Sequence, residues 1–187
     1  MYGLIHQAAR SMVIEKFGQA IWDEILVSAG VVEDDFVSTR AYPDTQTLDL
    51  VGAIATRANL SVPDLLRSFG HYWIGFASRS HYAPVMRISG DTLEEFLGNL
   101  DRMHNSIRMA IPEARMPSFR VMNTRADGVD IAYSSSRAGL EPFVVGLLEG
   151  LMERFQQQGE VRQVGAGERG MIFSLHYQRV AKQSAVP

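Results

Sequence analysis

The spacing of apolar residues changes after Pro112, and this change constrains the fold more than any other feature of the 187-residue chain. Before it, apolar residues recur every three or four positions, as in amphipathic helices. Helices are predicted over residues 2–16, 19–29, 44–59 and 61–78 and over a further segment that begins near Asp91. Gly30 suits a helix C-terminus, Ser61 suits a helix N-cap, and Asp91 with Glu94 resembles a capping box.

Beyond Pro112 the apolar residues alternate, which is the pattern of half-buried strands. Two alternating runs flank Arg-Ala-Asp-Gly at 125–128, and Asp-Gly in this setting is typical of a β-hairpin. An apolar helix entered through Pro142 follows, and then a second hairpin that turns near 165–170. This order predicts an α+β fold, in which an N-terminal helical lobe packs on a C-terminal lobe with a four-stranded antiparallel sheet and helices.

The length indicates one domain, over residues 1–180, and we expect a helical lobe over 1–60, a second lobe over 61–180 and a flexible tail over 181–187. The net charge of −3 gives no electrostatic reason to expect nucleic acid as a partner. The chain has no apolar run long enough to span a membrane, and its first residues lack the pattern of a signal peptide. We therefore expect a cytoplasmic protein with no membrane partner.

The chain contains no cysteine. This excludes disulfides, thiolate-bound haem or zinc, iron–sulfur clusters and a cysteine nucleophile. Any metal would depend on histidine, carboxylate, methionine or tyrosine ligands.

Three polar residues at alternate positions, Tyr133, Ser135 and Arg137, are predicted to share one face of a strand. A guanidinium with two hydroxyls beside it is suited to bind a carboxylate or a phosphate. The alternative interpretation is an ordinary half-exposed strand face, because these residue types are common in strands.

His104 lies on the apolar stripe of the helix that begins near Asp91. A histidine in this position is more often a structural residue than a metal ligand, and the helix offers it no second ligand. A single histidine suits a metal whose other positions are already filled, as in a porphyrin. A haem would also give the arginine-bearing strand two propionates to bind.

Five segments together resemble the H-NOX family of haem nitric-oxide/oxygen-binding domains, which includes the haem domain of soluble guanylate cyclase. They are MYGLI, FGHYW, NLDRMHNSI, YSSSR and GLLEGLMERF. The resemblance implies haem b as the cofactor, placed between the two lobes with residues 61–180 as the haem-binding lobe, and His104 as the axial ligand of the iron. It implies that Tyr133, Ser135 and Arg137 bind the propionates and that Ile5 and Pro117 pack against the porphyrin.

The resemblance also implies which residues line the gas-binding side, namely Trp73, Phe143 and Leu147. Oxygen-binding members carry a tyrosine nine residues after the motif tyrosine, and here that position is Pro142, which donates no hydrogen bond. Trp73 either donates through its indole or only fills space. We therefore expect binding of NO and CO and exclusion of O2.

No catalytic apparatus is evident, because Ser135 has no base beside it and no pair of acids stands out. We expect a stand-alone bacterial gas sensor and not an enzyme. The resemblance implies signal transduction by release of His104 when NO binds. The expected partner is a sensor histidine kinase or a cyclic-di-GMP synthase or phosphodiesterase.

Two alternatives remain at this stage. The first is a haem-free domain of the same fold, in which Arg137 holds the carboxylate of a small molecule and His104 is structural. The second is a haem enzyme such as a peroxidase, which would need a distal histidine or arginine, and here His6 and His71 are not placed by the sequence.

Overall fold

The computed structural model describes residues 1–32, 36–111 and 115–179. Pro112 and the predicted tail 181–187 lie outside these ranges. Six helices come first: α1 (Gly3–Phe17), α2 (Gln19–Ala29), α3 (Asp44–Ala58), α4 (Val62–Arg79), α5 (Ala83–Ile88) and α6 (Leu93–Ala110). They are followed by β1 (Ser118–Arg125), β2 (Gly128–Ser134), α7 (Glu141–Arg154), β3 (Gln157–Gly167) and β4 (Gly170–Arg179).

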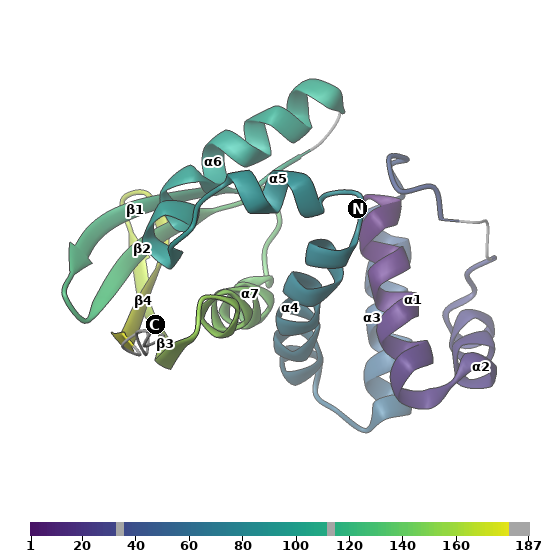
Figure 1. Cartoon of the computed structure of the whole chain (residues 1–187). Coiled ribbons are helices and arrows are strands. Elements are labelled where there is room, and N and C mark those ends of the chain that lie inside the picture. The colour runs from purple at the N-terminus through teal and green to yellow at the C-terminus, as the bar shows by residue number, and fades with distance from the viewer. Residues whose placement is uncertain (33–35, 112–114, 180–187) are drawn as a thin grey trace, which may run out of the picture.

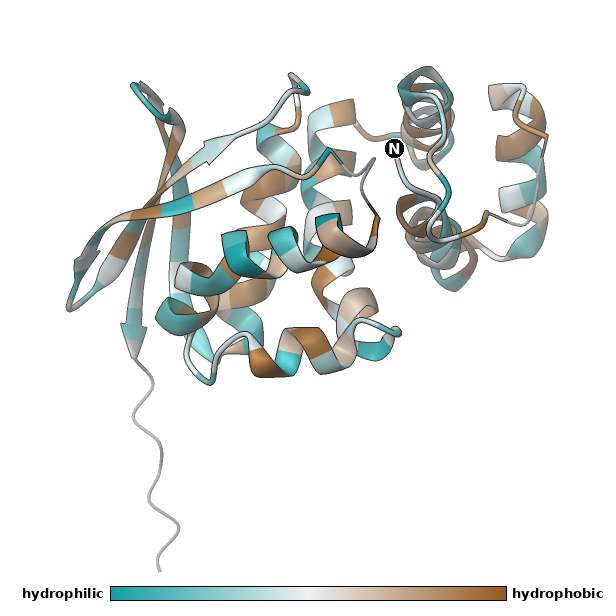
Figure 2. Ribbon diagram, turned by 90° about the horizontal axis from the view of Figure 1, so that it is seen from above, coloured by the Kyte–Doolittle hydropathy of each residue, from teal (hydrophilic) through white to brown (hydrophobic). Residues whose placement is uncertain are grey.

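The four strands form one antiparallel sheet in the order β1-β2-β4-β3, so that β1 and β3 are its edges. The predicted α+β class and both hairpins are confirmed. Figure 1 shows α1, α2 and α3 on one side of α4, with α7 on the other side of α4 and the sheet beyond it. Brown and teal residues alternate along the helices in Figure 2, as expected for amphipathic helices with one buried face. No helix in the described ranges is both long enough and apolar enough to cross a membrane.

Helix termini follow local chemistry with one shift from the prediction. Ser61 caps α4 by accepting a hydrogen bond from the Asp64 amide at 3.2 Å, and Gly30 ends α2 in a left-handed conformation, both as predicted. The α6 cap lies one residue later than predicted. The Thr92 hydroxyl accepts from the Glu95 amide because Thr92 is the residue with extended backbone angles.

Two apolar cores meet at α4. Leu65 and Phe69, near the start of α4, pack into a core built mainly from α1, α2 and α3. Ile74 and Ala77, one to three turns later, pack into a second core with α5, α6, α7 and the sheet. Trp73 contacts both cores, and helix α4 therefore joins the two lobes.

Helices α4 and α7 lie side by side because glycine occupies their contact (Figure 1). A Cβ atom on Gly146 would overlap the carbonyl oxygen of Arg67, and one on Gly70 would overlap that of Phe143. Backbone meets backbone here, and no side chain larger than hydrogen fits between the helices.

We predict opposite effects for two glycine-to-alanine changes in helices. Gly146→Ala should destabilise the protein by about 1–3 kcal/mol, because the new methyl group forces α4 and α7 apart. Gly98→Ala in α6 should stabilise it by up to about 1 kcal/mol, because a Cβ there meets open space and alanine favours a helix. Urea unfolding measures both changes, and an equal effect of the two would contradict the packing argument.

His6 is a buried histidine in the core of the N-terminal lobe, with 1% of its surface exposed. Its Nε2 lies 2.8 Å from the Thr47 hydroxyl, and its ring contacts Phe36 and Tyr42. Its Nδ1 has no hydrogen-bond partner among the described residues. Burial lowers the pKa of His6 to about 4, so the imidazole is neutral at pH 7.

The buried imidazole should make the protein less stable in acid. Because the unfolded chain binds a proton at His6 near pH 6.5 and the folded protein does so only near pH 4, stability should fall as the pH drops through this window. The expected loss between pH 8 and pH 5 is about 2 kcal/mol in urea unfolding. His6→Phe keeps a ring and cannot be protonated, so it should lose less. An identical pH dependence in both proteins would contradict this assignment.

Candidate functional site

A cavity lies between the two lobes, enclosed by α1, α4, α5, α6, α7 and the chain around β1 and β2. Most of its lining is hydrocarbon, with the helices contributing residues such as Ile74, Met86, Phe96, Leu100, Leu147 and Leu151. Among the described lining residues there is no aspartate or glutamate, and the only arginines are Arg115 and Arg137. A cavity of this kind suits a large apolar ligand with negative charge at one edge.

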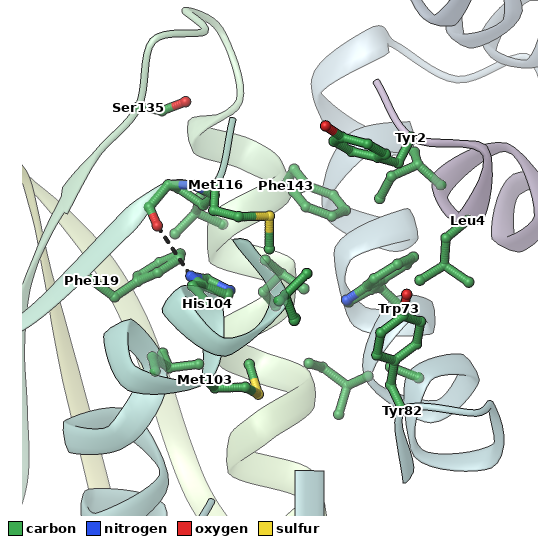
Figure 3. A pocket seen from close by; sticks show the side chains of 18 of the residues that line it. Tyr2, Leu4, Trp73, Tyr82, Met103, His104, Met116, Phe119, Ser135 and Phe143 are labelled. Carbon is green, nitrogen blue, oxygen red and sulfur yellow. Dashed lines mark hydrogen bonds between the residues drawn. The ribbon is translucent and has the colours of Figure 1, made fainter. Parts of the chain in front are cut away.

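His104 reaches the cavity from α6, with Nδ1 3.1 Å from the carbonyl oxygen of Pro117 (Figure 3). A carbonyl oxygen only accepts, so Nδ1 carries the proton and Nε2 keeps its lone pair. Burial lowers the pKa of His104, which favours the neutral ring, while the Pro117 bond raises it in part. A neutral imidazole held at Nδ1 is the form that metal-binding histidines take.

The arginine motif lies where the chain leaves the sheet. Strand β2 ends at Ser134, so the prediction that Tyr133, Ser135 and Arg137 share one strand face is wrong for Ser135 and Arg137. Ser135 turns the chain instead, because its hydroxyl accepts from the Arg137 amide at 3.1 Å. All three residues nevertheless line the cavity, and the pKa of the buried Tyr133 is raised by desolvation.

Arg137 is paired with Asp44, a residue that the sequence does not single out. Its Nε and Nη2 donate to the two carboxylate oxygens at 2.9 and 3.1 Å, and its Nη1 donates to the Arg115 carbonyl at 3.1 Å. The hydrogen bond from Arg137, followed by that from the Met1 ammonium, lowers the pKa of Asp44 to about 2. Asp44 is 93 residues away in sequence, and no local pattern indicates this pairing.

The other predicted lining residues are brought together in the same cavity. Ile5, Pro117, Trp73, Phe143 and Leu147 all line it. The chain also places Tyr2 and Tyr82 near Trp73, and no sequence pattern indicated either residue (Figure 3).

Three residues considered earlier do not line the cavity. Pro142 lies outside the lining, since the lining positions of α7 (143, 144, 147, 148 and 151) follow one helical face that excludes it. His6 lies in the N-terminal core, and His71 pairs on the surface with Glu153 at 2.7 Å. Neither histidine can serve as a distal catalytic group in this arrangement. Within the described ranges, no three histidines or carboxylates come together as a metal site. The described lining of the cavity holds no histidine besides His104 and no carboxylate.

Similarity to other proteins agrees with this geometry. The model of the Haem-NO-binding family matches residues 2–163. The soluble guanylate cyclase gcy-37 of Caenorhabditis elegans is 32% identical over 151 residues, which cover 79% of this chain and 21% of that protein. Soluble guanylate cyclase 89Db of Drosophila melanogaster is 24% identical over 155 residues, 83% of this chain and 23% of its own length. The chain thus spans about a fifth of these relatives.

Solved structures show the same fold. An H-NOX protein from S. oneidensis in the Fe(II)NO state has a TM-score of 0.83 at 23% identity, covering 95% of this chain and 99% of that one. An oxygen-binding H-NOX domain related to soluble guanylate cyclases, in its oxygen complex, has a TM-score of 0.80 at 21% identity, with 95% of each chain covered. Because the family model spans most of the sequence, this chain belongs to the Haem-NO-binding, or H-NOX, family.

Proposed function

We propose that this chain binds haem b in the cavity and senses NO and CO. The observation that carries the proposal is the tautomer of His104. Its Nδ1 is hydrogen-bonded to the Pro117 carbonyl, so its Nε2 keeps a lone pair that can ligate iron. Haem, when bound, would supply an iron that can bind a diatomic gas. Ile5 and Pro117, which both line the cavity, would pack against the porphyrin.

The arginine end of the cavity can accept the propionates without losing its present contacts. A guanidinium has five N–H donors, and Arg137 uses three of them on Asp44 and Arg115. The remaining two, with the hydroxyls of Tyr133 and Ser135, would bond the propionate oxygens. Two carboxylates in an apolar cavity need such donors, because burying them unpaired is costly.

The residues from α7 support selection of NO and CO over O2. Bound O2 carries partial negative charge and gains from a hydrogen-bond donor, whereas Phe143 and Leu147 present only hydrocarbon. Solved structures of this fold include an oxygen complex, so the fold alone does not set the preference. The side chains around the gas set it, and the lining residues that carry a hydrogen-bond donor on this side of the cavity include Tyr2, Trp73 and Tyr82 (Figure 3).

The output is proposed to be a change of surface read by a separate cytoplasmic partner. Release of His104 from the iron would leave α6 held by its packing in the core and by its hydrogen bonds to neighbouring segments, among them the bond from His104 to Pro117. The two positions of α6 would then present different surfaces, which is the difference that a partner needs. We propose a bacterial sensor histidine kinase or a cyclic-di-GMP synthase or phosphodiesterase as this partner.

His104 should be required for haem binding. His104→Ala, expressed in haem-replete cells, should purify with at least tenfold less haem per protein by Soret absorbance, because the axial bond is lost. Added imidazole should restore the absorbance by filling the vacated position. His71→Ala, on the surface, should retain full haem content. Colourless wild-type protein would instead favour a haem-free carboxylate-binding domain.

Gas selectivity should depend on Phe143 and not on Pro142. The ferrous wild-type protein should form NO and CO complexes and no lasting oxy complex in air. Phe143→Tyr places a donor on the lining face of α7 and should lengthen the life of an oxy spectrum by about tenfold, as expected for one hydrogen bond. Pro142→Tyr, outside the lining, should not. A stable oxy spectrum in the wild type would overturn the proposed selectivity.

A further inference from the structure

We infer that Asp101 is a positioning residue for the haem ligand. It holds the segment 117–119 against α6 and thereby sets both the orientation of the His104 imidazole and the place of Pro117. The inference rests on the proposed function, because it assigns to Asp101 an effect on the bond between His104 and iron.

Two hydrogen bonds join the Asp101 carboxylate to the start of β1. Oδ1 accepts from the Phe119 amide at 2.7 Å, and Oδ2 accepts from the Ser118 hydroxyl at 2.8 Å. Both oxygens of the carboxylate are therefore engaged by adjacent residues of one segment. Charge-assisted bonds of this length are among the stronger hydrogen bonds in proteins.

Asp101 and His104 are three positions apart in α6, so their side chains leave the same face of the helix one turn apart. His104 bonds the carbonyl of Pro117, and Asp101 bonds the next two residues. One turn of α6 thus holds three consecutive residues. The acceptor that fixes His104 is itself fixed by Asp101.

The position of β1 explains why this contact needs a side chain. Strand β1 is an edge of the sheet, so its outward amides have no neighbouring strand to bond. Asp101 supplies the missing acceptor at Phe119. The ring of Phe119 is buried and lies 5.8 Å from that of His104 and 5.2 Å from that of Tyr133, centroid to centroid. Loss of the two Asp101 hydrogen bonds would therefore disturb two neighbours of the His104 imidazole, the Pro117 carbonyl and the Phe119 ring.

In the proposed sensor, Asp101 would couple the movement of α6 to that of Pro117. As long as Asp101 holds segment 117–119, any shift of this turn of α6 carries Pro117 with it. Movement of His104 and movement of Pro117, which we propose to contact the porphyrin, would then be one event. Partners that orient a metal-ligating histidine typically change metal affinity by 10–100-fold when they are removed.

The experiment compares Asp101→Ala with Asp101→Asn. Alanine removes both bonds, so haem should dissociate about 10–100-fold faster and the iron–histidine stretching band in resonance Raman spectra should move to lower frequency. Asparagine can still accept from the Phe119 amide and donate to the Ser118 oxygen, so it should behave nearly as the wild type. Ser118→Ala, which removes one bond, should be intermediate. The matched control is Asp91→Ala, which removes another aspartate carboxylate just before the N-cap of α6. It should change neither readout.

A second measurement uses the haem-free protein. In Asp101→Ala the Phe119 amide should exchange with solvent at least tenfold faster, and nitrogen NMR should show His104 no longer held in the Nδ1–H tautomer. Unchanged exchange and tautomer would overturn the inference, as would a wild-type stretching band in Asp101→Ala. An asparagine variant as impaired as the alanine variant would also overturn it, since charge and not geometry would then be responsible. A wild-type protein unable to bind haem would refute the proposed function itself, and the inference with it.

Discussion

One hydrogen bond, between Nδ1 of His104 and the carbonyl oxygen of Pro117, determines what the cavity can do. The bond places the imidazole proton on Nδ1 and turns the lone pair of Nε2 outward. The described lining contains no second histidine and no carboxylate, so among the described residues His104 offers the only imidazole that could bind a metal in this cavity. The apolar walls matter for the same reason, because they keep the ring neutral by excluding water.

The cavity lies between two separate apolar cores, one in each lobe, that adjoin at α4. Glycine at the contact brings the backbones of α4 and α7 together, and α4 then carries apolar side chains into both lobes. Trp73 lies where the two cores adjoin, and Ile5 and Phe143 pack against the N-terminal core while lining the cavity. A ligand in this space would contact both lobes at once, so its binding and their relative placement are physically linked.

The sequence predicted the elements well and the contacts between them only in part. Amphipathic spacing and caps such as Ser61 are local properties, and they located the longer helices. The short α5 was missed, because six residues are too few to show a helical period. His104 and Arg137 were predicted from chemistry and from the family resemblance, and both line the cavity. The prediction that the strand continues through Ser135 was wrong, because the Ser135 hydroxyl accepts a hydrogen bond from the Arg137 amide and so favours a turn over strand pairing.

The contacts that escaped prediction are those that join distant segments. Asp44 meets Arg137 across 93 residues, and Asp101 meets the start of β1 through a connection that no local pattern specifies. Pro142 was singled out by counting along the sequence, whereas the lining is set by helical phase, which turns Phe143 inward. Register along a strand and phase around a helix depend on tertiary packing, and a single sequence does not fix them to one residue.

The pairing of Asp44 with Arg137 has two opposing effects on an anionic ligand. The carboxylate competes for the guanidinium and repels a second negative charge. It also holds Arg137 in one orientation, with the Arg115 carbonyl, so that little side-chain entropy is lost when a ligand carboxylate arrives. The Asp44 side chain is 46% exposed, so water screens its repulsion, while the two unused donors of Arg137 act at contact distance. The benefit of holding Arg137 in place therefore outweighs the repulsion between Asp44 and the ligand. The Arg137 end of the cavity favours a ligand that carries carboxylates at its edge.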